Sequence, residues 1–104
     1  MIKDKILFIC RSGVNRSRTA SFLLNELGYN TDYTGLSYAD EKLPDAQIVV
    51  FMESDHIKFV EEFFPEMLKN KKIFCLNIPD NYEFNEPNLR RIILKKIKNL
   101  GLLK

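Results

Sequence analysis

The sequence predicts a small α/β domain, a doubly wound four-stranded parallel sheet with helices on both faces. Two observations carry this prediction. Short runs of apolar, strand-forming residues alternate with segments whose apolar residues recur at helical spacing. The first apolar run is continuous rather than alternating, as in a strand that is buried on both faces. Right-handed crossovers then favour the strand order 2-1-3-4, and residues 1–104 are interpreted as a single domain.

The first half of the chain holds two expected strands and one expected helix. Ile6–Ile9 is the continuous apolar run. Ser17–Leu27 has apolar residues at helical spacing and is followed by Gly28, which is a common residue at helix ends. Thr31–Thr34 is expected as a second strand at the edge of the sheet. Residues 35–45 contain glycine, serine, aspartate and proline and are interpreted as a loop.

The second half repeats the alternation. Ile48–Met52 is the clearest strand, and Glu53–Phe64 follows as a helix that Pro65 ends. Three further elements are expected: a helical turn over 66–69, a strand over 72–76 and an ordered loop over 77–87. The last helix has apolar residues at helical spacing from Leu89 to Leu100, with basic residues on its other side.

Composition limits the function classes. With 45% apolar and 29% charged residues the chain is typical of globular proteins, and its net charge of +2 is too small to indicate nucleic-acid binding. No apolar stretch approaches the ~20 residues of a membrane span, and no signal peptide or lipidation motif is evident. We therefore expect a cytoplasmic protein with reduced thiols. Two cysteines and one histidine make a structural zinc site implausible, no cofactor is expected, and the oligomeric state is not indicated.

The most informative segment lies where the first strand is expected to lead into the first helix. It runs from Cys10 to Ser17, at a junction where the first helical N–H groups lack partners and favour anions. Gly13 and Asn15 tolerate the positive φ values that turn loop N–H groups inward. The loop is therefore expected to bind phosphate through Arg11, Ser12, Gly13, Val14 and Asn15.

The side chains of this segment suit nucleophilic chemistry. Cys10 is expected to be a thiolate at neutral pH, because loop N–H groups and a helix N-terminus stabilise the anion. The planar fork of Arg16 matches two phosphate oxygens, and Ser17 is placed to donate a hydrogen bond to the sulfur. The alternative is a small buried cysteine that only packs.

Asp80 is a candidate general acid. It follows the expected strand over 72–76, and the carboxyl ends of parallel strands meet at one edge of the sheet. We therefore expect Asp80 on the same side as Cys10, where it could protonate a leaving oxygen. The alternative is that Asp80 caps a turn.

Three blocks of sequence, in this order and spacing, resemble the low-molecular-weight protein tyrosine phosphatases, most closely their short bacterial members. The blocks are residues 6–21, 48–53 and 78–82. The resemblance implies a protein tyrosine phosphatase that acts through a cysteinyl-phosphate on phosphotyrosine proteins or small aryl phosphates. It assigns these roles: nucleophile to Cys10, phosphate binding to Arg16, thiolate stabilisation to Ser17, general acid to Asp80 and an aromatic wall of the entrance to Tyr82.

The chain departs from the family pattern at three points. Gly13 stands where the family commonly has an asparagine that braces the loop. Asn15 stands where many members carry a second cysteine that protects the nucleophile. The chain is also shorter, chiefly in the loops that frame the substrate. The first departure bears on the rigidity of the loop and the third on the identity of the substrate.

Residues 13–17 also echo the phosphate loop of dual-specificity phosphatases. In that class a histidine precedes the cysteine and the acid loop comes earlier in the chain. Here Ile9 precedes Cys10, and the candidate acid loop comes later. Chain order therefore favours the low-molecular-weight class.

Two other functions stay open on the same fold. One is a catalytically weak module that binds phosphate or phosphopeptides. The other is an arsenate reductase, which would need further thiols where the chain offers only Cys75. Cys75 is expected in the core, and His56 on a helix surface or behind the site.

Overall fold

Four parallel strands form the sheet in a computed structural model that describes residues 4–102. The strands are β1 (Ile6–Ile9), β2 (Thr31–Thr34), β3 (Ile48–Phe51) and β4 (Lys72–Cys75). Their order is β2-β1-β3-β4, and each neighbouring pair is parallel over four residues. The predicted α/β class and strand order are confirmed.

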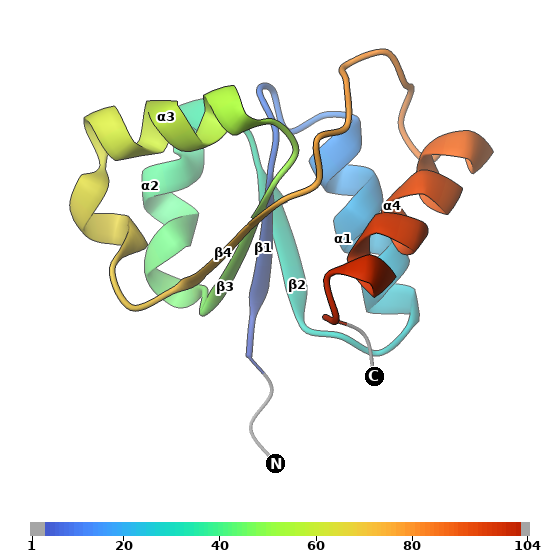
Figure 1. Ribbon diagram of the computed structural model, residues 1–104, viewed down its shortest axis with the longest axis horizontal. Helices are drawn as coiled ribbons and strands as arrows, with labels where there is room; N and C mark the ends of the chain where they lie inside the picture. The colour runs from blue at the N-terminus through green and yellow to red at the C-terminus, as the bar shows by residue number, and fades with distance from the viewer. Residues whose placement is uncertain (1–3, 103–104) are drawn as a thin grey trace.

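Helices cover both faces of the sheet. They are α1 (Arg16–Glu26), α2 (Ala39–Lys42), α3 (Ser54–Phe63) and α4 (Pro87–Asn99). Figure 1 shows α1 and α4 on one face and α2 and α3 on the other. Side chains of β1 alternate between the two cores, with Phe8 packed on the side of α1 and α4 and Ile9 on the side of α2 and α3. This two-sided burial is the reason for the continuous apolar run in β1.

Residues 36–45 are helical, so the prediction of a loop over 35–45 was wrong for all of them except Gly35. Around α2 lie two 3₁₀ helices, η1 (Leu36–Tyr38) and η2 (Leu43–Asp45). Leu36, Ala39 and Leu43 are buried in the core beneath them. Their spacing of three and four residues is helical, but glycine, proline and aspartate nearby obscured it in the sequence.

The other boundaries agree with expectation to within a few residues. The helical turn after α3 is η3 (Pro65–Leu68). α4 begins at Pro87, where a proline is tolerated because the first turn of a helix needs no N–H partner.

The carboxyl edge of the sheet carries two loops, uppermost in Figure 1. One joins β1 to α1 through residues 10–15, and the other joins β4 to α4 through residues 76–86. The predicted nucleophile and the predicted acid therefore leave the sheet at the same edge. Among residues 4–102, no helix is long and apolar enough to cross a bilayer.

Candidate active site

Cys10 is buried at the carboxyl end of β1, and two hydrogen-bonding groups contact its sulfur. The backbone N–H of Gly13 donates to Cys10 Sγ over 3.2 Å. Ser17 Oγ lies 3.1 Å from the same sulfur, from the first turn of α1. Both contacts come from residues of the loop and of the start of the helix that follows it. The structure thus brings together the cysteine, the loop and the hydroxyl that the sequence singled out.

The loop over residues 10–15, the predicted phosphate loop, is shaped by backbone packing against the end of β2. Gly13 has a φ of 75°, and a Cβ atom there would lie 2.5 Å from the nitrogen of Gly35. Leu36 N donates to the carbonyl of Arg11 over 3.0 Å. These contacts hold the loop near the position at which the family that the sequence resembles commonly has an asparagine. Asn15 has a φ of −108°, so its expected positive φ was wrong, and it serves as the residue before α1.

Arg16 is almost fully buried and is held by two acceptors. Its Nη1 donates to Glu53 Oε2 over 2.6 Å and to the carbonyl of Ile78 over 2.7 Å. Its Nε lies 3.7 Å from Asp80 Oδ1 and has no hydrogen-bond partner within residues 4–102. A buried, unsatisfied donor on a cation beside a free thiol favours an anionic acceptor at this place.

Glu53 contacts both Arg16 and His56. The hydrogen bond from Arg16 holds the pKa of Glu53 below its ordinary value. His56 Nε2 lies 3.5 Å from Glu53 Oε2, and neither ring nitrogen has a hydrogen-bond partner in the described part of the chain. Burial lowers the pKa of His56, and the charge of Arg16 lowers it further. His56 is fully buried, so its expected place on the helix surface was wrong and the place behind the site is the observed one.

Glu53 was not among the predicted site residues, although the sequence holds a signal for it. Glu53 follows β3 directly after Met52, at the edge of the sheet where Cys10 follows β1. A carboxylate at that edge is a candidate partner for the arginine of a phosphate loop.

The loop over residues 76–86, the predicted acid loop, packs against α1. The guanidinium of Arg18 lies 4.0 Å from the ring centroid of Phe84, and Phe22 meets the same ring edge to face. Asn85 N donates to Thr19 Oγ1 over 2.7 Å. The docked loop therefore keeps Asp80 beside Arg16, with the Asp80 side chain 58% exposed to solvent.

Tyr82 lies in the loop after β4, on the side that borders α4. It is half-buried against the core and lines a groove with residues of α4, a groove that includes none of residues 10–17. Its part in holding a phenyl ring stays a prediction. Two apolar side chains nearer the phosphate loop are strongly exposed, Val14 in the loop itself and Tyr38 in η1.

Cys75 is half-buried on the edge strand rather than in the core, and its thiol donates to Asn77 Oδ1 over 3.3 Å. Both cysteines are free. Cys75 pairs with Phe51, which pairs with Ile9, so two strand spacings of about 4.8 Å separate Cys75 from the end of β1. This exceeds the ~7 Å that a disulfide spans between α-carbons without backbone movement. Within residues 4–102, no group of three or more His, Cys, Asp or Glu side chains is arranged to hold a metal ion.

A parallel sheet of order β2-β1-β3-β4, with a cysteine-to-arginine loop between β1 and α1, defines the low-molecular-weight protein tyrosine phosphatase fold, and solved structures bear this out. Wzb from Vibrio vulnificus, solved with benzylphosphonate, has a TM-score of 0.72 at 16% identity over 97% of this chain and 99% of its own. The low-molecular-weight protein tyrosine phosphatase SP-PTP from Streptococcus pyogenes has a TM-score of 0.71 at 15% identity, over 99% and 94%.

A third similar structure has a different activity in its name. The YwlE arginine phosphatase from Geobacillus stearothermophilus has a TM-score of 0.64 at 21% identity, over 95% of this chain and 94% of its own. The sequence matches no protein-family model and has no significant match among curated proteins. The three solved structures confirm, for the fold, the resemblance seen in the sequence.

Proposed function

We propose that the protein is a cysteine-dependent phosphomonoesterase of the low-molecular-weight tyrosine phosphatase type. One observation carries the proposal. The sulfur of Cys10 accepts a hydrogen bond from Gly13 N–H, while the neighbouring Arg16 keeps a buried Nε without a hydrogen-bond partner in residues 4–102. A stabilised thiolate beside an unsatisfied cationic donor suits attack on a bound phosphate.

In the first step Cys10 Sγ attacks phosphorus in line with the leaving oxygen. The S–P bond forms, the P–O bond breaks, and its electron pair goes to the departing oxygen. Asp80 gives that oxygen a proton. Arg16 and the other N–H groups of residues 11–15 hold the three equatorial oxygens, over which negative charge is spread in the transition state.

In the second step water hydrolyses the cysteinyl-phosphate. Asp80, now a carboxylate, takes a proton from the water as its oxygen attacks phosphorus. The S–P bond breaks and its electron pair returns to Cys10. Gly13 N–H and the hydroxyl of Ser17 stabilise the departing thiolate, so Ser17 acts on the leaving group rather than on the phosphate.

Phosphotyrosine proteins or small aryl phosphates are the proposed substrates. The similar structures are named as tyrosine phosphatases and as an arginine phosphatase, so an oxygen and a nitrogen leaving group must be compared directly. A cytoplasmic setting would keep the two free cysteines reduced.

The two alternative functions are less well supported. A phosphate-binding module without turnover predicts an Asp80 turned away from Cys10; the position of Asp80, 3.7 Å from the Arg16 that follows the Cys10 loop, supports the enzyme instead. An arsenate reductase needs a second thiol within reach of Cys10, and Cys75 lies two strand spacings away.

The test is turnover of p-nitrophenyl phosphate, a phosphotyrosine peptide and phosphoarginine, each in the presence of a chelator. We expect turnover that Cys10→Ser abolishes while the variant still binds tungstate. Equal turnover in Cys10→Ser would contradict the mechanism. Tungstate binding by the unaltered protein without any turnover would support the binding module instead.

A further inference from the structure

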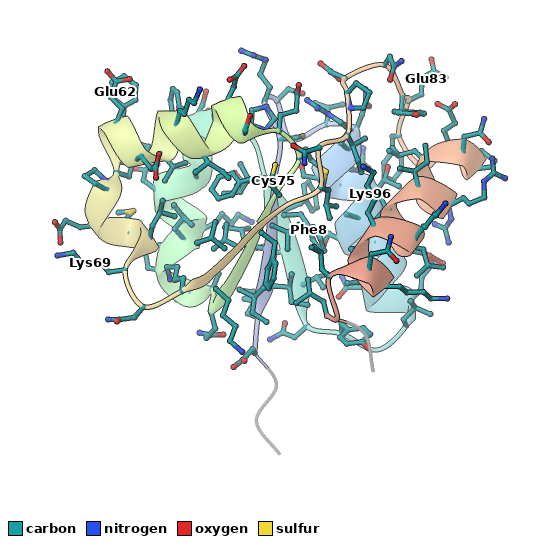
Figure 2. The ribbon with its side chains drawn as sticks, viewed as in Figure 1. Phe8, Glu62, Lys69, Cys75, Glu83 and Lys96 are labelled. Atoms are coloured by element: carbon teal, nitrogen blue, oxygen red, sulfur yellow. The ribbon has the colours of Figure 1, made fainter. Side chains whose placement is uncertain are left out.

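A groove of about 450 Å³ lies between the acid loop and α4. The loop contributes Asn77, Ile78, Pro79 and Tyr82, and α4 contributes Ile92, Lys95 and Lys96. Figure 2 shows Lys96 on the side of α4 that is turned toward β4 and the loop after it. The groove combines apolar walls with two ammonium groups.

The charge of this groove is not neutralised by the protein. No ion pair within residues 4–102 involves Lys95 or Lys96, whereas Arg90 on the same helix is paired with Glu26. The lining also contains no aspartate or glutamate. A second hollow across the loop, by contrast, is lined by Glu53 and Asp55. The α4 groove is therefore complementary to carboxylates with apolar neighbours.

The groove shares a wall with the candidate active site. Ile78 lines the groove, and its carbonyl accepts the hydrogen bond from Arg16 Nη1. Pro79 and Tyr82 line the groove on either side of Asp80 in sequence. An extended peptide advances by about 3.3 Å per residue. A chain with its phosphorylated residue at Cys10 therefore needs only a few residues to cross the acid loop.

We propose that the groove is a subsite for the acidic segment of a phosphorylated protein substrate. This inference rests on the proposed phosphatase function and names its substrate class. Carboxylates within about four residues of the phosphorylated side chain pair with Lys95 and Lys96, while an apolar side chain between them packs against Ile92 and Tyr82. Partly exposed ion pairs are individually weak, so two lysines give a preference of about tenfold in kcat/KM that salt weakens.

The test compares two charge-reversed variants. The groove variant is Lys95→Glu/Lys96→Glu. The control variant is Arg91→Glu/Lys98→Glu, which makes the same charge change at exposed positions of α4 outside the groove. Each is assayed with p-nitrophenyl phosphate and with phosphotyrosine peptides that carry glutamate, alanine or lysine on one side of the phosphotyrosine or the other.

We expect the unaltered protein and the control variant to prefer glutamate peptides about tenfold over lysine peptides in kcat/KM. The groove variant should lose or invert this preference while its turnover of p-nitrophenyl phosphate stays unchanged. The preference should also shrink as salt is raised.

Three outcomes would overturn the proposal. Turnover of p-nitrophenyl phosphate by the unaltered protein without preference for acidic peptides overturns the subsite and leaves the phosphatase function standing. No turnover of any substrate contradicts the phosphatase function and the subsite with it. Binding of anionic vesicles or RNA that only the groove variant loses, without peptide preference, assigns the groove to those polyanions.

Discussion

Gly13 and Gly35 approach each other so closely that neither position has room for a Cβ atom. A Cβ on Gly13 would lie 2.5 Å from the nitrogen of Gly35, and one on Gly35 would lie 2.6 Å from the carbonyl carbon and oxygen of Ser12. The obstructing atoms are backbone atoms, which cannot rotate away as a side chain can. The φ of 75° at Gly13 adds a second reason for glycine. The phosphate loop is thus held by contact with the end of β2.

Gly13→Ala should therefore lower the free energy of unfolding by about 2–4 kcal/mol, from the left-handed φ and the backbone clash together. Gly28→Ala is the matched control, because Gly28 has a φ of 94° but nothing within 4 Å of its Cβ position. The control should cost only about 1 kcal/mol. Urea unfolding measures both.

Binding of tungstate supplies the second measurement. Gly13→Ala should weaken it, since the displaced loop no longer presents the Gly13 N–H, and Gly28→Ala should leave it unchanged. Equal losses of stability in the two variants would mean that the loop moves freely away from Gly35.

Arg16→Lys should reduce kcat/KM for p-nitrophenyl phosphate by about a hundredfold or more. Arg16 Nη1 donates hydrogen bonds to Glu53 and Ile78 while its Nε lies beside Asp80. The single ammonium group of a lysine cannot keep these hydrogen bonds and also donate to a phosphate at the position of Nε. Arg11→Lys is the control, because Arg11 is exposed and keeps its backbone N–H. It should stay within about threefold of the unaltered protein. Nearly full activity in Arg16→Lys would mean that the positive charge, not the fork of Arg16, decides activity, and a similar loss in both variants would mean that the effect is not specific to Arg16.

Much of this fold and part of the site follow from local pattern. Continuous apolar runs identified the strands, and the chain order of strand, loop and helix placed Cys10 and Arg16 at one edge. Contacts between segments that are distant in the sequence could not be predicted from local pattern. The positive φ of Gly13 was predicted, but its packing against Gly35 was not, because the sequence does not show which residue lies against it. The direction of Tyr82 likewise depends on how α4 packs beside the acid loop.

His56 should make the stability of the protein depend on pH. Burial lowers its pKa below the ordinary value of 6.5, with Arg16 adding to the effect. Above about pH 6.5 the imidazole is neutral in both the folded and unfolded states. As pH falls through 6.5, the unfolded chain gains a proton that the folded protein does not, so stability falls until the folded pKa is reached.

Urea unfolding at pH 7.5, 6.5 and 5.5 measures this effect. The free energy of unfolding should decrease by up to about 1.4 kcal/mol per pH unit in this range, and His56→Gln should lose most of the decrease. No other histidine is present in the sequence. Glu53, whose pKa is lowered from 4.5, affects stability only at lower pH. The same decrease in His56→Gln would assign it to other groups.

Asp80→Asn should impair catalysis to an extent set by the leaving group. A phenolate that is a poor leaving group needs a proton as the P–O bond breaks, whereas p-nitrophenolate leaves with little help. The loss of kcat/KM, which includes no step after the leaving group departs, should therefore be about a hundredfold or more for phenyl phosphate and much smaller for p-nitrophenyl phosphate. Glu83→Gln is the matched control, since Glu83 is exposed in the same loop (Figure 2) and should change neither rate.

The comparison separates a proton donor from a group that only shapes the site. Asp80 also lies 3.7 Å from Arg16, so its loss could act by releasing the guanidinium. That effect would weaken phosphate binding and slow both substrates equally, because both carry the same phosphoryl group. Equal losses for phenyl and p-nitrophenyl phosphate would thus leave Asp80 as a positioning residue for Arg16. Unequal losses would establish proton transfer to the leaving oxygen, which a module that only binds phosphate does not perform.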